Sequence, residues 1–144
     1  MRSITLMALI MVLSASAAFA DEQAAILKVA QGAVDLQRGE RTLHPAPGDS
    51  LLVGDILRTG QDGSAGVMFL DGTRIGLGPS SEMSLKAYRF SPAKKDYAFD
   101  VFMNKGSAAY TSGKLGKMAP EAVKFSTPNA TVGIRGTKFL VKVD

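Results

Sequence analysis

Few residues of this chain could take part in catalysis. His44 is the single histidine, and it stands directly before Pro45 in a stretch of turn residues. A Ser-His-Asp arrangement would have to use it, whereas a histidine in such a stretch is usually a solvated side chain. The chain has no cysteine, which excludes disulfides and thiolate metal sites. The sequence therefore predicts a protein that is not an enzyme, and an envelope hydrolase that uses His44 is the alternative.

The acidic residues do not form a metal site either. They are scattered among turn residues, where a carboxylate can accept hydrogen bonds from nearby backbone N–H groups. A calcium loop needs acidic residues at alternate positions within about a dozen residues, and that spacing is missing. We therefore predict no cofactor and no metal. The acidic residues considered are Asp35, Glu40, Asp49, Asp55, Asp62 and Asp71.

Two basic segments are the candidates for binding a partner. Residues 86–96 interleave basic and aromatic side chains, and residues 111–120 are basic, contain glycine and have the composition of a mobile loop. Such a segment can bind nucleic acid, because aromatic side chains stack on bases and basic ones contact phosphates. An amphipathic strand with a solvated basic face explains the first segment better. We expect a protein or a cell-envelope polymer as partner, and no nucleic acid. The candidate residues are Tyr88, Arg89, Lys94, Lys95, Lys114 and Lys117.

The N-terminus has the pattern of a cleavable signal peptide over residues 1–20. Arg2 is followed by an uncharged run from Ile4 to Leu13, and Ala18-Phe19-Ala20 matches the small-large-small cleavage pattern. An uncleaved membrane anchor is the alternative, although the run is short for a span. We expect a mature single domain over residues 21–144, located in the periplasm and without a transmembrane anchor.

Glycine-punctuated short strands predict the fold class. Fifteen glycines are spread almost evenly, and no window carries a convincing helical stripe. This pattern is typical of an all-β domain. We expect short strands in two packed, twisted sheets, solenoid-like or sandwich-like, with a first strand over residues 23–29 in which Leu27 and Val29 share one face. Two Gly-Asp pairs, Gly48-Asp49 and Gly54-Asp55, are expected at turns, because glycine accepts a positive φ and aspartate bonds the turn backbone.

The hairpin over residues 64–78 allows its register to be predicted. A two-residue turn would place Val67 and Ile75 on opposite faces, whereas a three-residue loop over 70–72 pairs them and also pairs Ala65 with Leu77. Because a slip of one residue moves every side chain to the other face, the shared apolar face selects the three-residue loop. Gly72 is then expected in a left-handed conformation. Gly72→Val should destabilise the protein much more than Asp71→Asn.

Further turns and strands complete the expected framework. Gly60 is expected at a turn, Thr73 follows the hairpin loop, and the same Gly-Thr step recurs at Gly136-Thr137. A second hairpin is expected on either side of a polar tip at residues 91–95. A closing hairpin is expected from Val123 and Phe125 into an alternating strand that ends at residue 143.

The order of these motifs resembles the FecR domain family, the periplasmic domain of ferric-citrate-type sigma regulators of Gram-negative bacteria. The resemblance covers about residues 26–143 and implies an all-β, non-catalytic interaction module. The regulators carry a sigma-binding helical segment and a membrane span before this domain, and the chain shows neither, so direct sigma-factor control is not expected. The motifs are Gly48-Asp49, Gly54–Gly60, Val67–Thr73, Ile75–Leu77, Thr127-Pro128, Val132–Thr137 and Phe139–Val141.

From these observations we expect a non-catalytic periplasmic binding or scaffolding module. It would recognise its partner through sheet edges or through the segments at 86–96 and 111–120, and strand addition to an open edge is a suitable mode. The alternative is a periplasmic signalling component that senses a ligand and relays to a separate membrane regulator.

Overall fold

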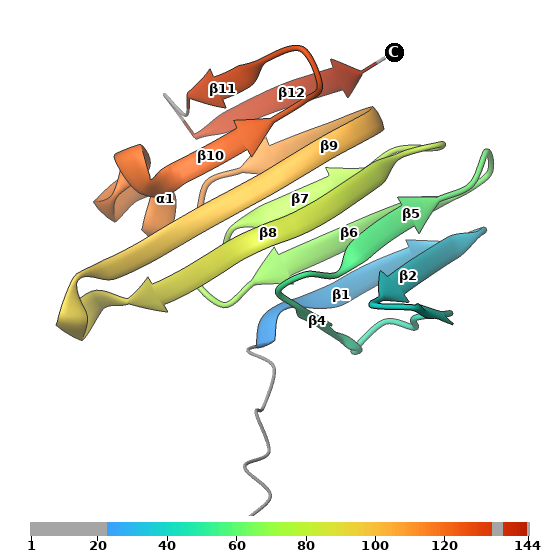
Figure 1. The fold of residues 1–144 in the computed structure, drawn as a ribbon, viewed down its shortest axis with the longest axis horizontal. Helices are drawn as coiled ribbons and strands as arrows, with labels where there is room; N and C mark the ends of the chain where they lie inside the picture. The colour runs from blue at the N-terminus through green and yellow to red at the C-terminus, as the bar shows by residue number, and fades with distance from the viewer. Residues whose placement is uncertain (1–22, 134–136, 144) are drawn as a thin grey trace, which may run out of the picture.

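The fold is all-β, as predicted, and a computed structural model describes residues 23–133 and 137–143 (Figure 1). The predicted signal peptide and the predicted turn at Gly136 lie outside the described residues. Three short helices accompany the strands: η1 (Pro92–Lys94), α1 (Lys114–Met118) and η2 (Pro120–Ala122). The strands are β1 (Gln23–Gln31), β2 (Val34–Arg38), β3 (Arg41–Leu43), β4 (Ser50–Leu52), β5 (Ile56–Thr59), β6 (Ser64–Phe69), β7 (Arg74–Leu77), β8 (Glu82–Ser91), β9 (Asp96–Thr111), β10 (Val123–Ser126), β11 (Thr131–Gly133) and β12 (Lys138–Val143).

The strands join in one continuous sheet instead of the two separate sheets that the sequence predicted. Strand β1 pairs with β6 and β2 with β5, while β6 pairs with β7 and β5 with β8. Strands β7 and β8 then both pair with the long strand β9. Each successive pair of short strands therefore acts as one long strand with a bend in its middle. The sheet folds over along the row of bends, and Figure 1 shows the two arms as layers, with β5 and β8 in front of β6 and β7.

Backbone hydrogen bonds between neighbouring bends stabilise the row of bends along which the sheet folds over. The N–H of Gly60 donates to the carbonyl of Ala33 at 2.9 Å, and Thr59 N–H donates to Ser81 O at 2.9 Å. Further along the row, Gly106 has φ +94°, and a Cβ there would lie 2.1 Å from the Ser81 hydroxyl oxygen. A side chain at position 106 would therefore push the bend of β9 away from the preceding bend.

The two arms enclose a single apolar core. Along β2, β5, β6, β7 and β10 the buried residues stand at every second position, which is the pattern of strands with one buried face. An aromatic group sits at its centre, with the Phe69 ring 4.9 Å from that of Phe99 and 5.2 Å from that of Tyr88. The largest fully buried side chains are Leu27, Leu36, Leu51, Leu57, Phe69, Ile75, Met83, Leu85, Phe99, Met103, Tyr110 and Phe125.

The predicted register of the 64–78 hairpin is confirmed. Val67 pairs with Ile75 and Ala65 pairs with Leu77, so all four side chains are buried on one face. Gly72 has φ +90° in the three-residue loop. The apolar face thus selected the register, as the pattern indicated.

Two sequence predictions about strands are wrong. Leu27 is buried but Val29 is 45 % exposed, because the pairing of β1 with β6 shifts between these residues and breaks the alternation. Residues 123–126 do not form a hairpin with the last strand. Instead β10 pairs with β11 and runs parallel to the first half of β9, while β12 pairs antiparallel with the second half of β9.

Candidate functional site

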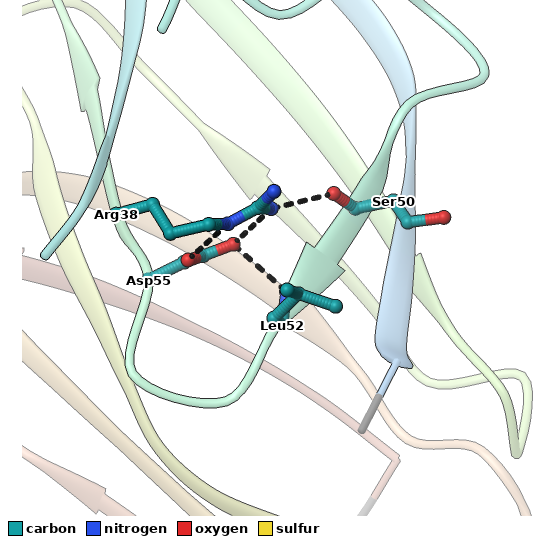
Figure 2. A network of polar contacts seen from close by, with 4 residues as sticks. All are labelled: Arg38, Ser50, Leu52 and Asp55. Atoms are coloured by element: carbon teal, nitrogen blue, oxygen red, sulfur yellow. Dashed lines mark hydrogen bonds and ion pairs between the residues drawn. The ribbon is translucent and has the colours of Figure 1, made fainter. Parts of the chain in front are cut away.

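The sheet has an edge at β4 that is closed by charged side chains (Figure 2). The Arg38 guanidinium donates from Nε to Asp55 Oδ1 at 3.0 Å and from Nη2 to Asp55 Oδ2 at 2.8 Å. The same Nη2 donates to the carbonyl oxygen of Ser50, and Leu52 N–H donates to Asp55 Oδ2 at 2.8 Å. We call these four residues the β4 clasp.

The β4 clasp occupies the backbone groups that would otherwise be open to another strand. Strand β4 pairs with β1 on one side, and Leu27 N–H bonds the carbonyl of Asp49 at the start of that ladder. Bonds of an antiparallel ladder alternate in direction, so the Ser50 carbonyl and the Leu52 N–H point away from β1. The clasp bonds both. A second strand would therefore have to displace these bonds in order to pair with β4.

The two Gly-Asp turns have the predicted chemistry. Asp49 accepts from Ala46 N–H and Asp55 accepts from Leu52 N–H, each at 2.8 Å and each three residues earlier in the chain. The preceding glycines, Gly48 and Gly54, have φ +99° and +97°. The turns differ in their surroundings, because Asp55 is buried and also holds Arg38, whereas residue 49 is exposed.

A second buried carboxylate lies at the hairpin loop between β6 and β7. Asp71 accepts from the Thr73 hydroxyl at 2.6 Å, from the Tyr88 hydroxyl at 2.8 Å and from the Leu115 N–H at 2.9 Å. The Thr73 N–H also donates to it at 3.3 Å, and Gly113 N–H donates to the Thr73 hydroxyl at 3.2 Å. We call this group the Asp71 node. It ties three separate segments of the chain together.

The Asp71 node also affects the acidity of nearby phenols. Burial, and then the hydrogen bond and negative charge of Asp71, raise the pKa of Tyr88 above its ordinary value. Burial likewise raises the pKa of Tyr110. Both phenols therefore remain protonated into alkaline solution, and the Tyr88 hydroxyl continues to donate to Asp71.

The segment at 111–120 is not the mobile loop that its composition predicted. It contains α1, Leu115 is fully buried, and the backbone of Lys114 and Leu115 donates to Asp71. Lys114 and Lys117 themselves project from α1 and are exposed. The glycines in the sequence suggested flexibility, whereas the buried carboxylate supplies the acceptor that orders the segment.

The first predicted binding segment divides into buried and exposed parts. Tyr88 is only 4 % exposed and bonds Asp71, so the prediction that it contacts a partner is wrong. Arg89 is paired with Asp96 at 3.1 Å on the surface. Lys94 and Lys95 are exposed at the tip between β8 and β9, at and just after η1.

His44 lies at the surface, with Nδ1 2.9 Å from Asp35 Oδ1. Its side chain is 81 % exposed and lines an open pocket of about 370 Å³ together with Leu36, Asp49 and Ser50. Within residues 23–133 and 137–143, no cluster of three potential metal ligands occurs.

Another edge of the sheet, at β12, is open. Strand β12 pairs with β9, and no other described strand pairs with it. Thr137 begins this ladder, because its carbonyl accepts from Ser112 N–H at 2.7 Å. From that bond the alternation places the ladder bonds at 139, 141 and 143. The N–H and carbonyl groups of Lys138, Leu140 and Lys142 therefore point outward, away from β9.

The side chains of β12 alternate in the same way. Phe139, Val141 and Val143 are half-buried against the core, and the Phe139 ring stacks on Tyr110 at 4.6 Å. Leu140 is 84 % exposed on the outer face between Lys138 and Lys142. Leu140 borders a shallow apolar groove of about 410 Å³ whose floor includes Gly76 and Ala109.

A family model described as "FecR protein" matches residues 55–144. The chain belongs to the FecR family. This is a regulatory, non-catalytic family that acts in signalling, and FecR domains are typically periplasmic. Searches of curated proteins and of solved structures found no match to the chain. None of the helices in the described part of the chain has the length and hydropathy of a membrane span.

The FecR match contains the Asp71 node and β12 but begins at Asp55, so Arg38 and strands β1 to β4 precede it. The β4 clasp could not be predicted from the sequence, because Arg38 and Asp55 are 17 positions apart and no sequence motif links them. The alternation of apolar residues predicted that residues 138–143 form a strand. It did not predict that this strand lies at an edge of the sheet.

Proposed function

We propose that this FecR domain is a non-catalytic periplasmic binding module that captures a partner protein by adding one of the partner's strands to β12. The observation that carries this proposal is the open edge of β12, where Lys138, Leu140 and Lys142 present backbone donors and acceptors outward. Strand addition satisfies such groups and buries apolar side chains of the new strand. Membership of a signalling family supports a protein partner over an envelope polymer, which remains the alternative.

The four exposed lysines of the two predicted segments are secondary in this proposal. Lys94 and Lys95 lie at the β8–β9 tip, and Lys114 and Lys117 lie on α1. Solvated lysines at such places contribute little binding energy individually. We expect them to affect the rate and salt dependence of association more than the lifetime of the complex.

A second function, relay of a ligand signal to a separate membrane regulator, is favoured by the family match. In that case the strand on β12 would belong to the regulator. Cross-linking through a photoreactive residue at position 140 in living cells would identify the protein that contacts this edge. A cross-link to a membrane regulator that changes in amount when the external ligand is added would support the relay.

The edge itself is tested by Leu140→Pro. Proline removes the outward N–H at position 140 while leaving the ladder to β9 intact, so we expect the partner identified by cross-linking to be lost from co-purification with an affinity-tagged chain. Leu140→Thr is the matched control, because it keeps the N–H and a strand-forming residue and should retain much of the binding. Equal capture by the wild-type chain and the proline variant would overturn the proposal. Alanine at all four lysines should leave capture largely intact.

Export is tested separately. We propose that residues 1–20 are removed, so the periplasmic form should have the mass of a chain that begins at Asp21. A mass that includes residues 1–20 would support the membrane-anchor alternative.

A further inference from the structure

We infer that the strand which binds β12 carries an apolar residue opposite Leu140 and a carboxylate two residues away on each side. This inference rests on the proposed function and names the chemistry of the partner strand. It follows from the charges and the register of the outer face around β12.

Among the described strands, the outer face presents positive charge without an acidic neighbour in the same rows. Lys138 and Lys142 are exposed on either side of Leu140, and their cross-strand neighbours on β9 are Thr111 and Ser107, which are uncharged. Beyond Thr111 the next residue in the same row is Arg74 of β7. Within the described residues, no acidic side chain forms an ion pair with either lysine.

An added strand would place its side chains in these same rows. Residues directly opposite in neighbouring strands have Cβ atoms about 5 Å apart, and opposite charges at such positions attract. A carboxylate in the row of Lys138 and another in the row of Lys142 lie four positions apart on the new strand. The position midway between them faces Leu140. Because this pattern is symmetric, it holds for a parallel and for an antiparallel partner.

The inner face of β12 indicates which residues alternate with the carboxylates on the partner strand. Phe139, Val141 and Val143 are only half-buried, so the core is incompletely covered at this edge. The residues of the new strand that alternate with the carboxylates would lie beside them and extend the core. The complete pattern is an acidic residue, three apolar residues and a second acidic residue.

The charges also argue against a second copy of this chain as the occupant. An antiparallel pair of β12 strands centred on Leu140 would set Lys138 of one copy opposite Lys142 of the other, twice. Like charges directly opposite in a ladder are destabilising, and lysine on an edge is a common protection against self-pairing. Lys138 and Lys142 thus disfavour pairing with β12 of a second copy and favour pairing with an acidic strand.

The test uses two synthetic peptides with the same soluble ends, one with the centre Glu-Val-Leu-Val-Glu and one with Lys-Val-Leu-Val-Lys. Binding to the purified chain is measured by fluorescence anisotropy at low and high salt. We expect the wild-type chain to prefer the acidic peptide by about tenfold at low salt, with a smaller preference at high salt. The double variant Lys138→Glu, Lys142→Glu should reverse the preference, and Leu140→Pro should lose both peptides.

The outcomes separate the inference from the proposed function. If both peptides bind equally and Leu140→Pro abolishes both, the edge binds strands but the inferred charge pattern is wrong. If neither peptide binds at millimolar concentration, or if Leu140→Pro binds as the wild type does, strand addition at β12 fails. Dimerisation of the chain at micromolar concentration that Leu140→Pro removes would show that a second copy occupies the edge. A cooperative thermal unfolding transition of each variant, well above the temperature of the assay, confirms that it is folded.

Discussion

The edges at β4 and β12 both direct backbone groups away from the sheet, but they differ in what bonds those groups. Both strands pair on one side, so each directs a row of N–H and carbonyl groups away from the sheet. At β4 the pair Arg38–Asp55 bonds the Ser50 carbonyl and the Leu52 N–H, whereas at β12 exposed lysines flank a leucine and the outward groups have no strand partner among the described residues. A row of unpaired groups invites another strand. One edge is therefore bonded by the chain's own side chains, and the other is the edge at which we propose that a partner strand binds.

The largest expected effect is the loss of the seal at β4. Asp55→Ala leaves Arg38 without its carboxylate and Leu52 N–H without its acceptor, and we expect a loss of about 3 kcal/mol of unfolding free energy. Asp49→Ala is the matched control, because it removes the same turn bond from an exposed site and should cost about 1 kcal/mol. Urea denaturation measures both. Equal losses would show that the clasp adds nothing to the turn.

The Asp71 node, which orders the segment before β12, should be nearly as sensitive. In Asp71→Asn the amide NH₂ replaces one carboxylate oxygen, so either Thr73 N–H or Leu115 N–H loses its acceptor. We expect a loss of about 2 kcal/mol. Gly72→Val, which forces φ +90° on a branched residue, should cost a similar amount. Sequence alone predicted that the glycine change would be far worse, and a large difference in urea denaturation would restore that prediction.

Alkaline solution should weaken the Asp71 node and spare the clasp. The pKa of Tyr88 is raised in the folded chain above the unfolded value of 10.0, so its contribution is complete below pH 10 and is lost as the pH rises further. Tyr110 shifts in the same direction. The loss is at most about 1.4 kcal/mol per pH unit for each phenol. Arginine stays protonated throughout, so the ion pair at β4 persists.

The measurement is a tyrosinate absorbance titration in a Tyr97→Phe variant, because the chain has three tyrosines and only Tyr88 and Tyr110 then remain. Denaturation at pH 8 and pH 11 gives the stability. Titration of both phenols near pH 10 without unfolding would contradict the assignment.

The smallest expected effect is on the stability of the β12 edge. Leu140→Pro removes an N–H that bonds nothing in β9, so we expect a loss of about 1 kcal/mol or less. Val141→Pro removes a ladder N–H one position further and should cost about 3 kcal/mol. Thermal unfolding of the two variants tests the assigned direction of the backbone. The reverse order would mean that Lys138, Leu140 and Lys142 face β9 instead of the open side.

Much of the fold could be predicted because its rules act locally. The Gly-Asp turns follow from glycine at positive φ and aspartate beside it, and the 64–78 register follows from one shared apolar face. Predictions went wrong where a distant segment decided the result. Val29 is exposed because the pairing of β1 with β6 shifts before it. Tyr88 is buried and donates to Asp71, which stands 17 positions earlier in the chain.

By itself the sequence determined a chain of short strands, the places of several of its turns and its family. The tertiary structure alone decided that these strands join in one folded sheet, that Asp71 gathers three segments, and that Arg38 meets Asp55. It also decided which strands are edges. The physical reason is range: side-chain alternation and turn chemistry act over a few residues, whereas the position of a strand in a sheet depends on hydrogen bonds between segments far apart in the chain.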